Sequence, residues 1–163
     1  MAISEKIKAL IRSAWDDGAP CLVATQGPNG PNISPKGSMV VFDDDHLAYW
    51  ERSKKQALEN LSHDKRICVI YANFKAQRDG VLDSGFLRFY GTAALHESGP
   101  VHDAIFKLLL PREQTHVGAD TGIGVLVKIA CRRRSRQAAA LTKGKEILAA
   151  CPVLNRPRSG WHR

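Results

Sequence analysis

Hydrophobic side chains follow a helical period at the start of the chain and a strand-like pattern after it. The first segment predicts an amphipathic helix whose apolar positions recur every three or four residues: Ile3, Ile7, Leu10, Ile11 and Ala14. Residues 16–20 are typical of a turn. Residues 21–25 then form a short apolar run, and an Asn-Gly pair lies in the turn 26–31. This change of period predicts a helix followed by a β-hairpin.

The same patterns predict further strands and two more helices. Strand-like segments occupy residues 32–34, 38–42, 46–51, 66–73, 85–95 and 124–129. The first two are separated by Pro35-Lys36-Gly37, which predicts a bend or bulge there. Helices are expected for about three turns from Ser53, and from Ser98-Gly99-Pro100 to Leu110 with Ser98 as N-cap. Short antiparallel strands joined by turns favour a small closed or partly closed barrel.

Composition limits the chain to one globular domain and concentrates its charge at one end. The 163 residues are 44% hydrophobic and 25% charged, enough for a single core. Of the net charge of +8, residues 1–127 contribute −1, because they hold 14 Lys and Arg against 15 Asp and Glu. Residues 128–163 hold ten against one and contribute +9. The basic character therefore belongs to the C-terminal segment alone.

This distribution argues against nucleic acid as a partner, because the basic segment has only Trp161 for base stacking. No apolar run is long enough to span a bilayer, and residues 1–13 lack the apolar core of a signal peptide. The sequence thus predicts a cytoplasmic protein with no membrane partner.

Cysteine and histidine spacing predicts no metal site. Cys21 and Cys68 lie within apolar runs, so we expect both to be buried reduced thiols. None of the four cysteines and six histidines has the spacing of a zinc site.

Three cations crowd the predicted helix start after residue 51. Ser53 and Gln56 have capping-box spacing, while Arg52, Lys54 and Lys55 lie where the helix dipole disfavours positive charge. A bound anion would explain why positive side chains lie at a helix start that disfavours them, because free amides, a hydroxyl and cations together bind phosphate. The alternative is that these long side chains extend into water and bind nothing.

The bend at residues 35–37 is a second candidate binding segment. Lys36 there has a glycine beside it and hydroxyls on both sides, so it can offer donors to the edge of a flat ligand. The alternative is an ordinary bent strand with a solvated lysine.

Together these two segments resemble the pyridoxamine 5′-phosphate oxidase-like family of FMN-binding split barrels. The resemblance covers residues 3–129 and rests on four stretches: Gly-Pro-Asn-Gly-Pro-Asn-Ile-Ser-Pro-Lys-Gly, Tyr-Trp-Glu-Arg-Ser-Lys-Lys, Gly-Phe-Leu-Arg-Phe-Tyr-Gly-Thr-Ala and Gly-Ile-Gly-Val-Leu-Val-Lys-Ile. It implies a mainly β fold, a six-stranded antiparallel split β-barrel with peripheral α-helices. It also implies a homodimer with FMN in two clefts between the protomers.

The matching motifs carry the family's site residues onto this sequence. Lys36, Gly37 and Ser38 would follow the isoalloxazine and ribityl edge, and Trp50 and Glu51 would line the cleft. Ser53, Lys54 and Lys55 would hold the phosphate, with Arg52 and Asn60 as further contacts. Arg88 would approach the flavin across the interface or form a salt bridge. Lys36 is the candidate donor that stabilises the anionic reduced flavin.

The resemblance implies an FMN-dependent oxidoreductase of unknown substrate, with a small-molecule electron donor or acceptor such as NADH or NADPH. The alternatives are a flavin carrier without turnover and a haem- or deazaflavin-binding relative. The C-terminal end lacks the substrate-binding pattern of the true pyridoxamine phosphate oxidases, which argues against vitamin B6 oxidation. We expect two regions, an FMN-binding domain at 1–129 and a loosely packed or partly disordered basic extension at 130–163.

Overall fold

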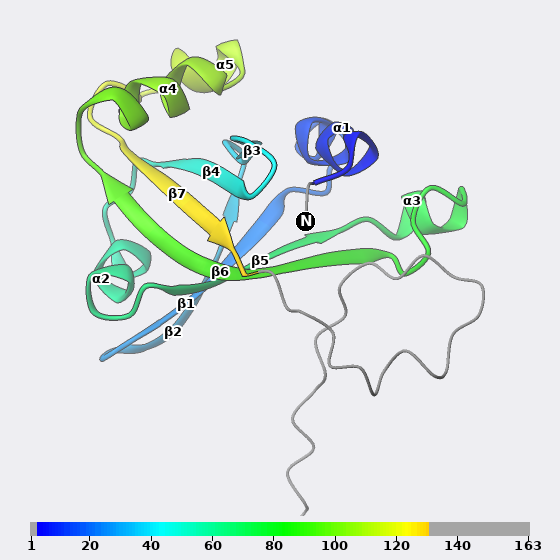
Figure 1. Ribbon diagram of the computed structural model, residues 1–163, viewed down its shortest axis with the longest axis horizontal. Coiled ribbons are helices and arrows are strands. Elements are labelled where there is room, and N and C mark those ends of the chain that lie inside the picture. Colours follow the sequence, from blue (N-terminus) through cyan, green and yellow to red (C-terminus); the bar gives the residue numbers. More distant parts are fainter. Residues whose placement is uncertain (1–2, 131–163) are drawn as a thin grey trace, which may run out of the picture. The chain divides into compact units, whose positions relative to one another are not determined.

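A single curved antiparallel sheet forms the body of the protein, which a computed structural model describes for residues 3–130 (Figure 1). Its strands follow the order β2-β1-β5-β6-β7-β4-β3. They are β1 (Cys21–Gly27), β2 (Gly30–Lys36), β3 (Val40–Val41), β4 (His46–Glu51), β5 (Arg66–Ala72), β6 (Phe86–His96) and β7 (Ile123–Ile129). The helices are α1 (Glu5–Ser13), α2 (Gln56–His63), α3 (Phe74–Arg78), α4 (Pro100–Leu108) and α5 (Pro111–Gln114). This arrangement confirms the expected mainly β class with peripheral helices, with seven strands instead of six.

The predicted first helix and first hairpin are both present. Ser4 caps α1 by accepting a hydrogen bond from the Ile7 amide, and Ile7 and Ile11 face the core. β1 and β2 pair along their whole length, and Gly30 opens β2 with a φ of 94° that a side chain would disfavour. Local sequence therefore determined this part of the fold.

The expected interruption at Pro35 and Lys36 is wrong, because β2 continues through both residues. β2 is an edge strand, so the missing N–H of Pro35 removes no hydrogen bond from the sheet. The chain breaks from the strand at Gly37 and Ser38. The predicted strand 38–42 is consequently reduced to β3, the short additional strand.

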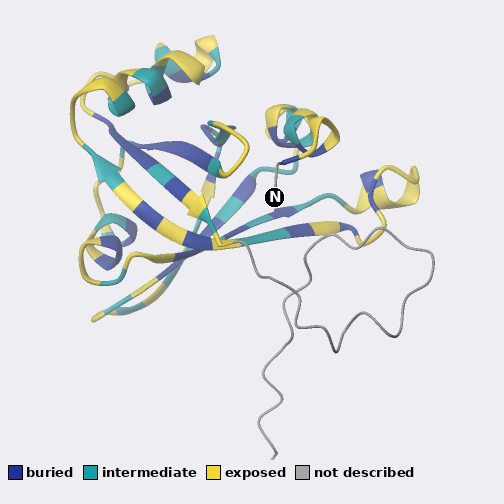
Figure 2. Ribbon diagram, viewed as in Figure 1, coloured by how far each residue is buried: buried dark blue, intermediate teal, exposed yellow. Residues whose placement is uncertain are grey.

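β4 is buried on both faces and joins two clusters of core residues (Figure 2). Leu47 and Tyr49 face the main core, which lies on the inner surface of the curved sheet. Ala48 and Trp50 face the opposite way and pack under α4 with Ile105. Because both faces are covered, the continuous apolar run of β4 is explained by its position.

Other predicted features differ in detail. Gly99, not Ser98, is the N-cap of α4, and Pro100 takes the first helical position as expected. The short helices α3 and α5 were not anticipated. Cys21 is buried, and burial raises the pKa of its thiol to about 12. Cys68 is only partly buried, contrary to expectation. Apart from Ala130, the predicted extension 130–163 lies outside the described residues.

Candidate functional site

The ends of β2 and β4 bring together a buried ion pair. The Lys36 Nζ lies 2.5 Å from the Glu51 Oε2, and both side chains are nearly inaccessible, at 9% and 3% exposed. The same ammonium lies 5.2 Å from the centre of the Tyr49 ring. The two residues are fifteen positions apart in sequence and meet because β2 and β4 end at the same corner. Lys36 is therefore a buried, paired cation and not the solvated side chain of the simpler interpretation.

Ser53 completes this network in place of capping a helix. Its amide and hydroxyl donate to the Glu51 Oε1 at 3.1 and 2.7 Å. Burial acts to raise the pKa of the Glu51 carboxyl, but the hydrogen bonds from Lys36 and Ser53 outweigh it and hold that pKa below its ordinary value. Glu51 is thus ionised at neutral pH and balances Lys36.

The predicted helix start at Ser53 is wrong, because α2 begins three residues later. Ser53 turns back to Glu51, Lys54 adopts a left-handed backbone with φ of 46°, and Lys55 becomes the N-cap with no side-chain cap. Gln56 donates to the Asn29 carbonyl and forms no capping box. The Leu58 and Glu59 amides donate to the Lys55 carbonyl at 2.9 and 3.2 Å, so the free first-turn amides in the described part of the chain are those of Gln56 and Ala57.

Lys54 and Lys55 are exposed beside this uncapped helix start. Neither ammonium forms an ion pair with an acidic side chain in the described part of the chain. Both lysines line a groove of about 440 Å³ between α2 and the end of β6. The other residues of its wall are Gln56, Leu58, Glu59, Ser62, Leu95 and Glu97. The corner thus combines two exposed cations, free amides and a concave surface.

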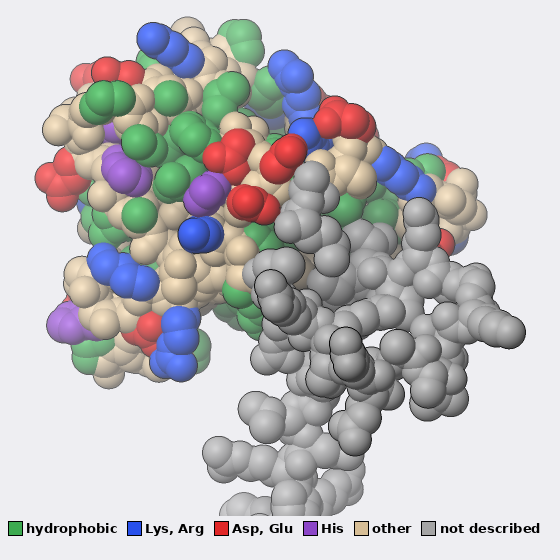
Figure 3. Space-filling view, in the orientation of Figure 1, with side chains coloured by type: hydrophobic (Ala, Val, Ile, Leu, Met, Phe, Trp, Pro, Cys, Tyr) green, Lys and Arg blue, Asp and Glu red, His purple; other side chains and the backbone are tan. Residues whose placement is uncertain are grey.

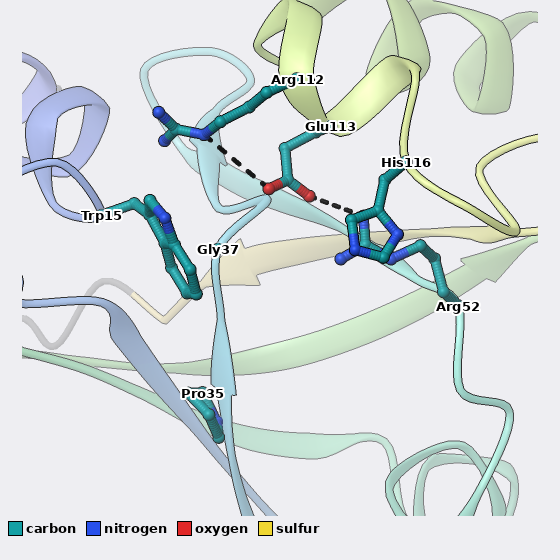
Figure 4. Close-up of a pocket in the computed structure, with 7 residues that line it drawn as sticks. All are labelled: Trp15, Pro35, Gly37, Arg52, Arg112, Glu113 and His116. Atoms are coloured by element: carbon teal, nitrogen blue, oxygen red, sulfur yellow. Dashed lines mark hydrogen bonds and ion pairs between the residues drawn. The ribbon is translucent and has the colours of Figure 1, made fainter.

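The Arg52 side chain points toward Glu113 on α5 (Figure 4). Its guanidinium donates to the Glu113 Oε2 at 2.7 Å, and Glu113 is 6% exposed. Arg112 Nε approaches the other oxygen of the same carboxylate at 4.0 Å. Arg52 therefore links the end of β4 to a helix 61 residues later in the chain. It does not contribute to the lysine corner, which we define as Lys54, Lys55 and the free amides at the start of α2.

Three of the expected site residues have structural partners. The Ser38 hydroxyl exchanges hydrogen bonds of 3.1 Å with the backbone of Trp50. The Trp50 indole donates to the Ala119 carbonyl at 2.8 Å and packs in the core under α4. The Asn60 amide is fully buried and donates to Thr25 and to the Gly30 carbonyl. These hydrogen bonds fix the backbone of β4, the residue after Gly37 and the helix α2 relative to one another.

Gly37 and Arg88 lie at two separate places. Gly37 packs against the Trp15 indole so closely that a Cβ there would lie 2.8 Å from a ring carbon. Arg88 projects from β6, where its guanidinium lies 5.1 Å from the centre of the Phe86 ring. It forms no salt bridge within residues 3–130, and its buried Nε has no hydrogen-bond partner there. Within one protomer, Arg88 therefore does not join the other candidates.

Sequence reasoning missed Trp15, Arg112 and Glu113, which meet Gly37 and Arg52 around a pocket. Arg112 and Glu113 follow Pro111 in a segment for which the sequence predicted neither a helix nor a strand, and Trp15 lies in the turn just after α1. Nothing in the sequence around Glu113 indicated that its carboxylate would be buried and paired with an arginine. Only its burial against Arg52 identifies it.

Charged groups are spread over the described surface. On the face shown in Figure 3, Lys and Arg side chains are scattered and do not form one basic patch. Within residues 3–130, no three His, Cys, Asp or Glu side chains cluster closely enough to hold a metal ion. No helix in this part of the chain is both long and apolar enough to cross a membrane.

Comparison with known proteins gives one family match. The family model described as pyridoxamine 5′-phosphate oxidase matches residues 3–120, which include every candidate residue. No curated protein sequence matches the chain.

Several solved structures share the fold. A variant of HupZ from Group A Streptococcus is 27% identical, with a TM-score of 0.60, and the match covers 79% of this chain and 96% of that one. A putative pyridoxamine 5′-phosphate oxidase from Lactobacillus delbrueckii is 22% identical, with a TM-score of 0.56 and coverages of 79% and 91%. An FMN-binding protein from Syntrophomonas wolfei is 15% identical, with a TM-score of 0.52 and coverages of 76% and 82%.

Proposed function

Because the chain belongs to the pyridoxamine 5′-phosphate oxidase family, we propose that it is an FMN-binding oxidoreductase whose flavin phosphate binds at Lys54 and Lys55. The lysine corner is the observation that carries this proposal. Two ammonium groups without acidic partners in residues 3–130 lie beside the uncapped first turn of α2. Amides and cations at a helix N-terminus suit a phosphate.

The backbone at Lys54 supports the same assignment. A φ of 46° in a non-glycine residue is a strained conformation, which costs about 1–3 kcal/mol and is concentrated at functional sites. The turn is fixed by the hydrogen bonds of Ser53 to Glu51. We infer that Ser53 acts on the phosphate through this turn, as a positioning residue, and that Lys54 and Lys55 make the direct contacts.

The flavin ring would lie along the Lys36-Gly37-Ser38 segment, with Lys36 and Glu51 in the wall. When bound, FMN supplies hydride acceptance at N5 and reoxidation by a second acceptor. Glu51 balances the charge of Lys36, so Lys36 contributes a fixed hydrogen-bond donor and not a free positive charge. NADH or NADPH is the electron donor to test first.

The proposed homodimer would use the outer face of the strands β2, β1, β5 and β6. Register places Ile33, Ala24, Cys68 and Tyr90 side by side in one row across these strands. Ile33 is 68% exposed and Tyr90 is 39% exposed, although both are large apolar side chains. Arg88 belongs to the adjacent row, opposite Ile70. An apolar face of this kind favours association with a second copy.

In this dimer, Arg88 would reach the partner's flavin site. Its guanidinium has no acidic partner within residues 3–130, and it lies on the same outer face as Tyr90, whose hydroxyl its Nη1 approaches at 3.5 Å. The lack of an acidic partner supports the interface role of Arg88 over the salt-bridge alternative.

A comparison of FMN with riboflavin tests the phosphate assignment. The double variant Lys54→Ala/Lys55→Ala should bind FMN at least about tenfold more weakly, because each charged hydrogen bond contributes about 1.5–3 kcal/mol. Its riboflavin affinity should stay at the wild-type value. Fluorescence titration of both ligands measures this, and Lys107→Ala, an exposed lysine on α4, is the matched control. Equal losses for the two ligands would contradict the assignment.

Reduction of the bound flavin tests the oxidoreductase activity. Anaerobic addition of NADH or NADPH to the FMN-loaded protein should bleach the flavin absorption band. A protein that binds FMN but is bleached by neither reductant, nor by a panel of oxidisable substrates, would be a carrier.

A further inference from the structure

A pocket of about 300 Å³ lies beside the candidate flavin segment and has no assigned role (Figure 4). Its walls come from the turn after α1, the end of β2, the residue after β4, and α5. The lining residues are Trp15, Pro35, Gly37, Arg52, Arg112, Glu113 and His116. Only Gly37 and Arg52 among them belong to the candidate flavin site. The volume is at the lower end of the range for small-molecule pockets, about 300–1,000 Å³.

One wall of the pocket is flat and apolar. The Trp15 ring is held against the backbone of Gly37, where even a Cβ would clash with it. Pro35 continues this wall along β2. The Trp15 side chain nevertheless remains 48% exposed, which is a large exposed area for an indole. Such a fixed and half-exposed ring is suited to stack with another flat ring.

The opposite wall carries hydrogen-bond donors in a fixed position. The buried Glu113 carboxylate anchors Arg52 at 2.7 Å. A guanidinium has five N–H donors, and Arg52 makes one side-chain hydrogen bond within residues 3–130. Its other N–H groups can therefore hold a carboxylate in the two-pronged geometry that arginine favours.

The charge balance of the pocket selects a monoanion over a phosphate. Arg52 and Arg112 share Glu113, and Arg112 also pairs with Asp16 outside the lining. The two arginines and the two carboxylates carry no net charge together. The pocket wall would therefore attract an anion mainly through directional hydrogen bonds and less through net positive charge. A carboxylate needs only those bonds, whereas a phosphate dianion would add a second uncompensated charge.

We propose that this pocket binds a flat aromatic carboxylate, with its ring against Trp15 and its carboxylate on Arg52. The identification of this ligand as the reaction partner of the flavin rests on the proposed function. The binding of the aromatic carboxylate does not depend on the proposed function, because five of the seven lining residues lie outside the candidate flavin site.

Calorimetric titration of the FMN-loaded protein with benzoate tests the proposal. Benzyl alcohol supplies the ring without the charge, and acetate supplies the charge without the ring. Benzoate should bind at least about tenfold more tightly than either, since stacking and a charged hydrogen bond each contribute. Comparable affinities for the three compounds would overturn the proposal.

Three variants separate the two walls. Trp15→Phe keeps a flat ring and should retain benzoate binding, whereas Trp15→Leu should lose about tenfold. Arg52→Gln should weaken benzoate binding about tenfold and leave benzyl alcohol binding unchanged. Val117→Ala, a 91% exposed position outside the lining, is the control. Equal benzoate affinities in Trp15→Phe and Trp15→Leu would exclude stacking and overturn the proposal.

The same titration distinguishes this proposal from the proposed function. If wild type binds no FMN, the proposed function fails, and benzoate titration of the FMN-free protein still tests the pocket. If FMN displaces benzoate, the pocket holds the flavin ring itself, and the proposal of a separate ligand is overturned.

Discussion

At the scale of single residues, the corner between β2 and β4 depends on one balanced pair of charges. Lys36 and Glu51 are both buried, and each would be costly to leave there without the other. Ser53 supplies two further hydrogen bonds to the same carboxylate. The pair therefore fixes the turn that leads to Lys54, so the charge state of Glu51 affects both stability and the candidate site.

Glu51→Gln should lower the free energy of unfolding by about 3–5 kcal/mol at pH 7, because it leaves the Lys36 ammonium buried without a counter-charge. The pKa of Glu51 is lower in the folded protein than in the unfolded chain, so its stabilising effect is complete above the unfolded pKa. That effect is lost as the pH falls below about 4.5 and through the folded pKa. The stability difference between wild type and variant should shrink accordingly.

Urea unfolding at a series of pH values measures this difference. The double variant Lys36→Met/Glu51→Gln removes both charges and should recover most of the lost stability at pH 7. A Glu51→Gln penalty that stayed constant from pH 7 to pH 3, or no recovery in the double variant, would contradict the assigned ion pair.

At the scale of elements, α2 is held in place by the hairpin beneath it. Asn60 on α2 donates to Thr25 on β1 at 3.2 Å and to the Gly30 carbonyl at the start of β2 at 3.1 Å. Gly27 leaves the space for this side chain, since a Cβ there would lie 2.2 Å from the Asn60 Oδ1. The position of the helix start, and with it the lysine corner, follows from this contact.

Asn60→Ala should destabilise the fold by about 1–3 kcal/mol, because a buried carbonyl and hydroxyl lose their donor. It should also weaken FMN binding, whereas riboflavin binding should change less, since the displaced element carries the phosphate site. Thermal unfolding and ligand titration measure the two effects. Ser62→Ala, an exposed position on the same helix, is the control. An unchanged unfolding temperature for Asn60→Ala would argue against this anchoring role.

At the scale of the whole molecule, the curved sheet buries one face and leaves much of the other apolar. Val23 on β1 and Val69 on β5 face the core, while Ile33 on β2 and Tyr90 on β6 lie on the outer face of the same sheet. The outer row crosses four strands, so its apolar area is continuous. Two copies that met at these faces would cover it and would bring Arg88 toward the second protomer.

Tyr90→Glu should convert the proposed dimer to a monomer. The symmetric interface would then bury two carboxylates, one from each protomer, without counter-charges. Light scattering coupled to size-exclusion chromatography measures the mass. Val117→Glu places the same charge at an exposed site away from this face and should leave the mass unchanged. A wild-type protein that is monomeric at all concentrations would exclude the interface.

The amino-acid sequence by itself determined the elements whose signals are local. The period of apolar residues predicted α1, and the bounds expected for β4 are those observed, because its flanking turns are marked in the sequence. Family resemblance indicated the split-barrel fold and the residues to examine. These features depend on neighbours within a few positions, so they can be read along the chain.

Only the tertiary structure decided which of those residues meet. Ser53 has the spacing of a helix cap, but the buried Glu51 attracts its amide and hydroxyl, and α2 therefore begins three residues later. Arg52 was grouped with Lys54 and Lys55 by sequence, yet Glu113 draws it to the opposite side of the corner. These outcomes depend on partners brought close by the folded sheet, and the interaction energy of a buried charge is set by those partners and not by its sequence neighbours.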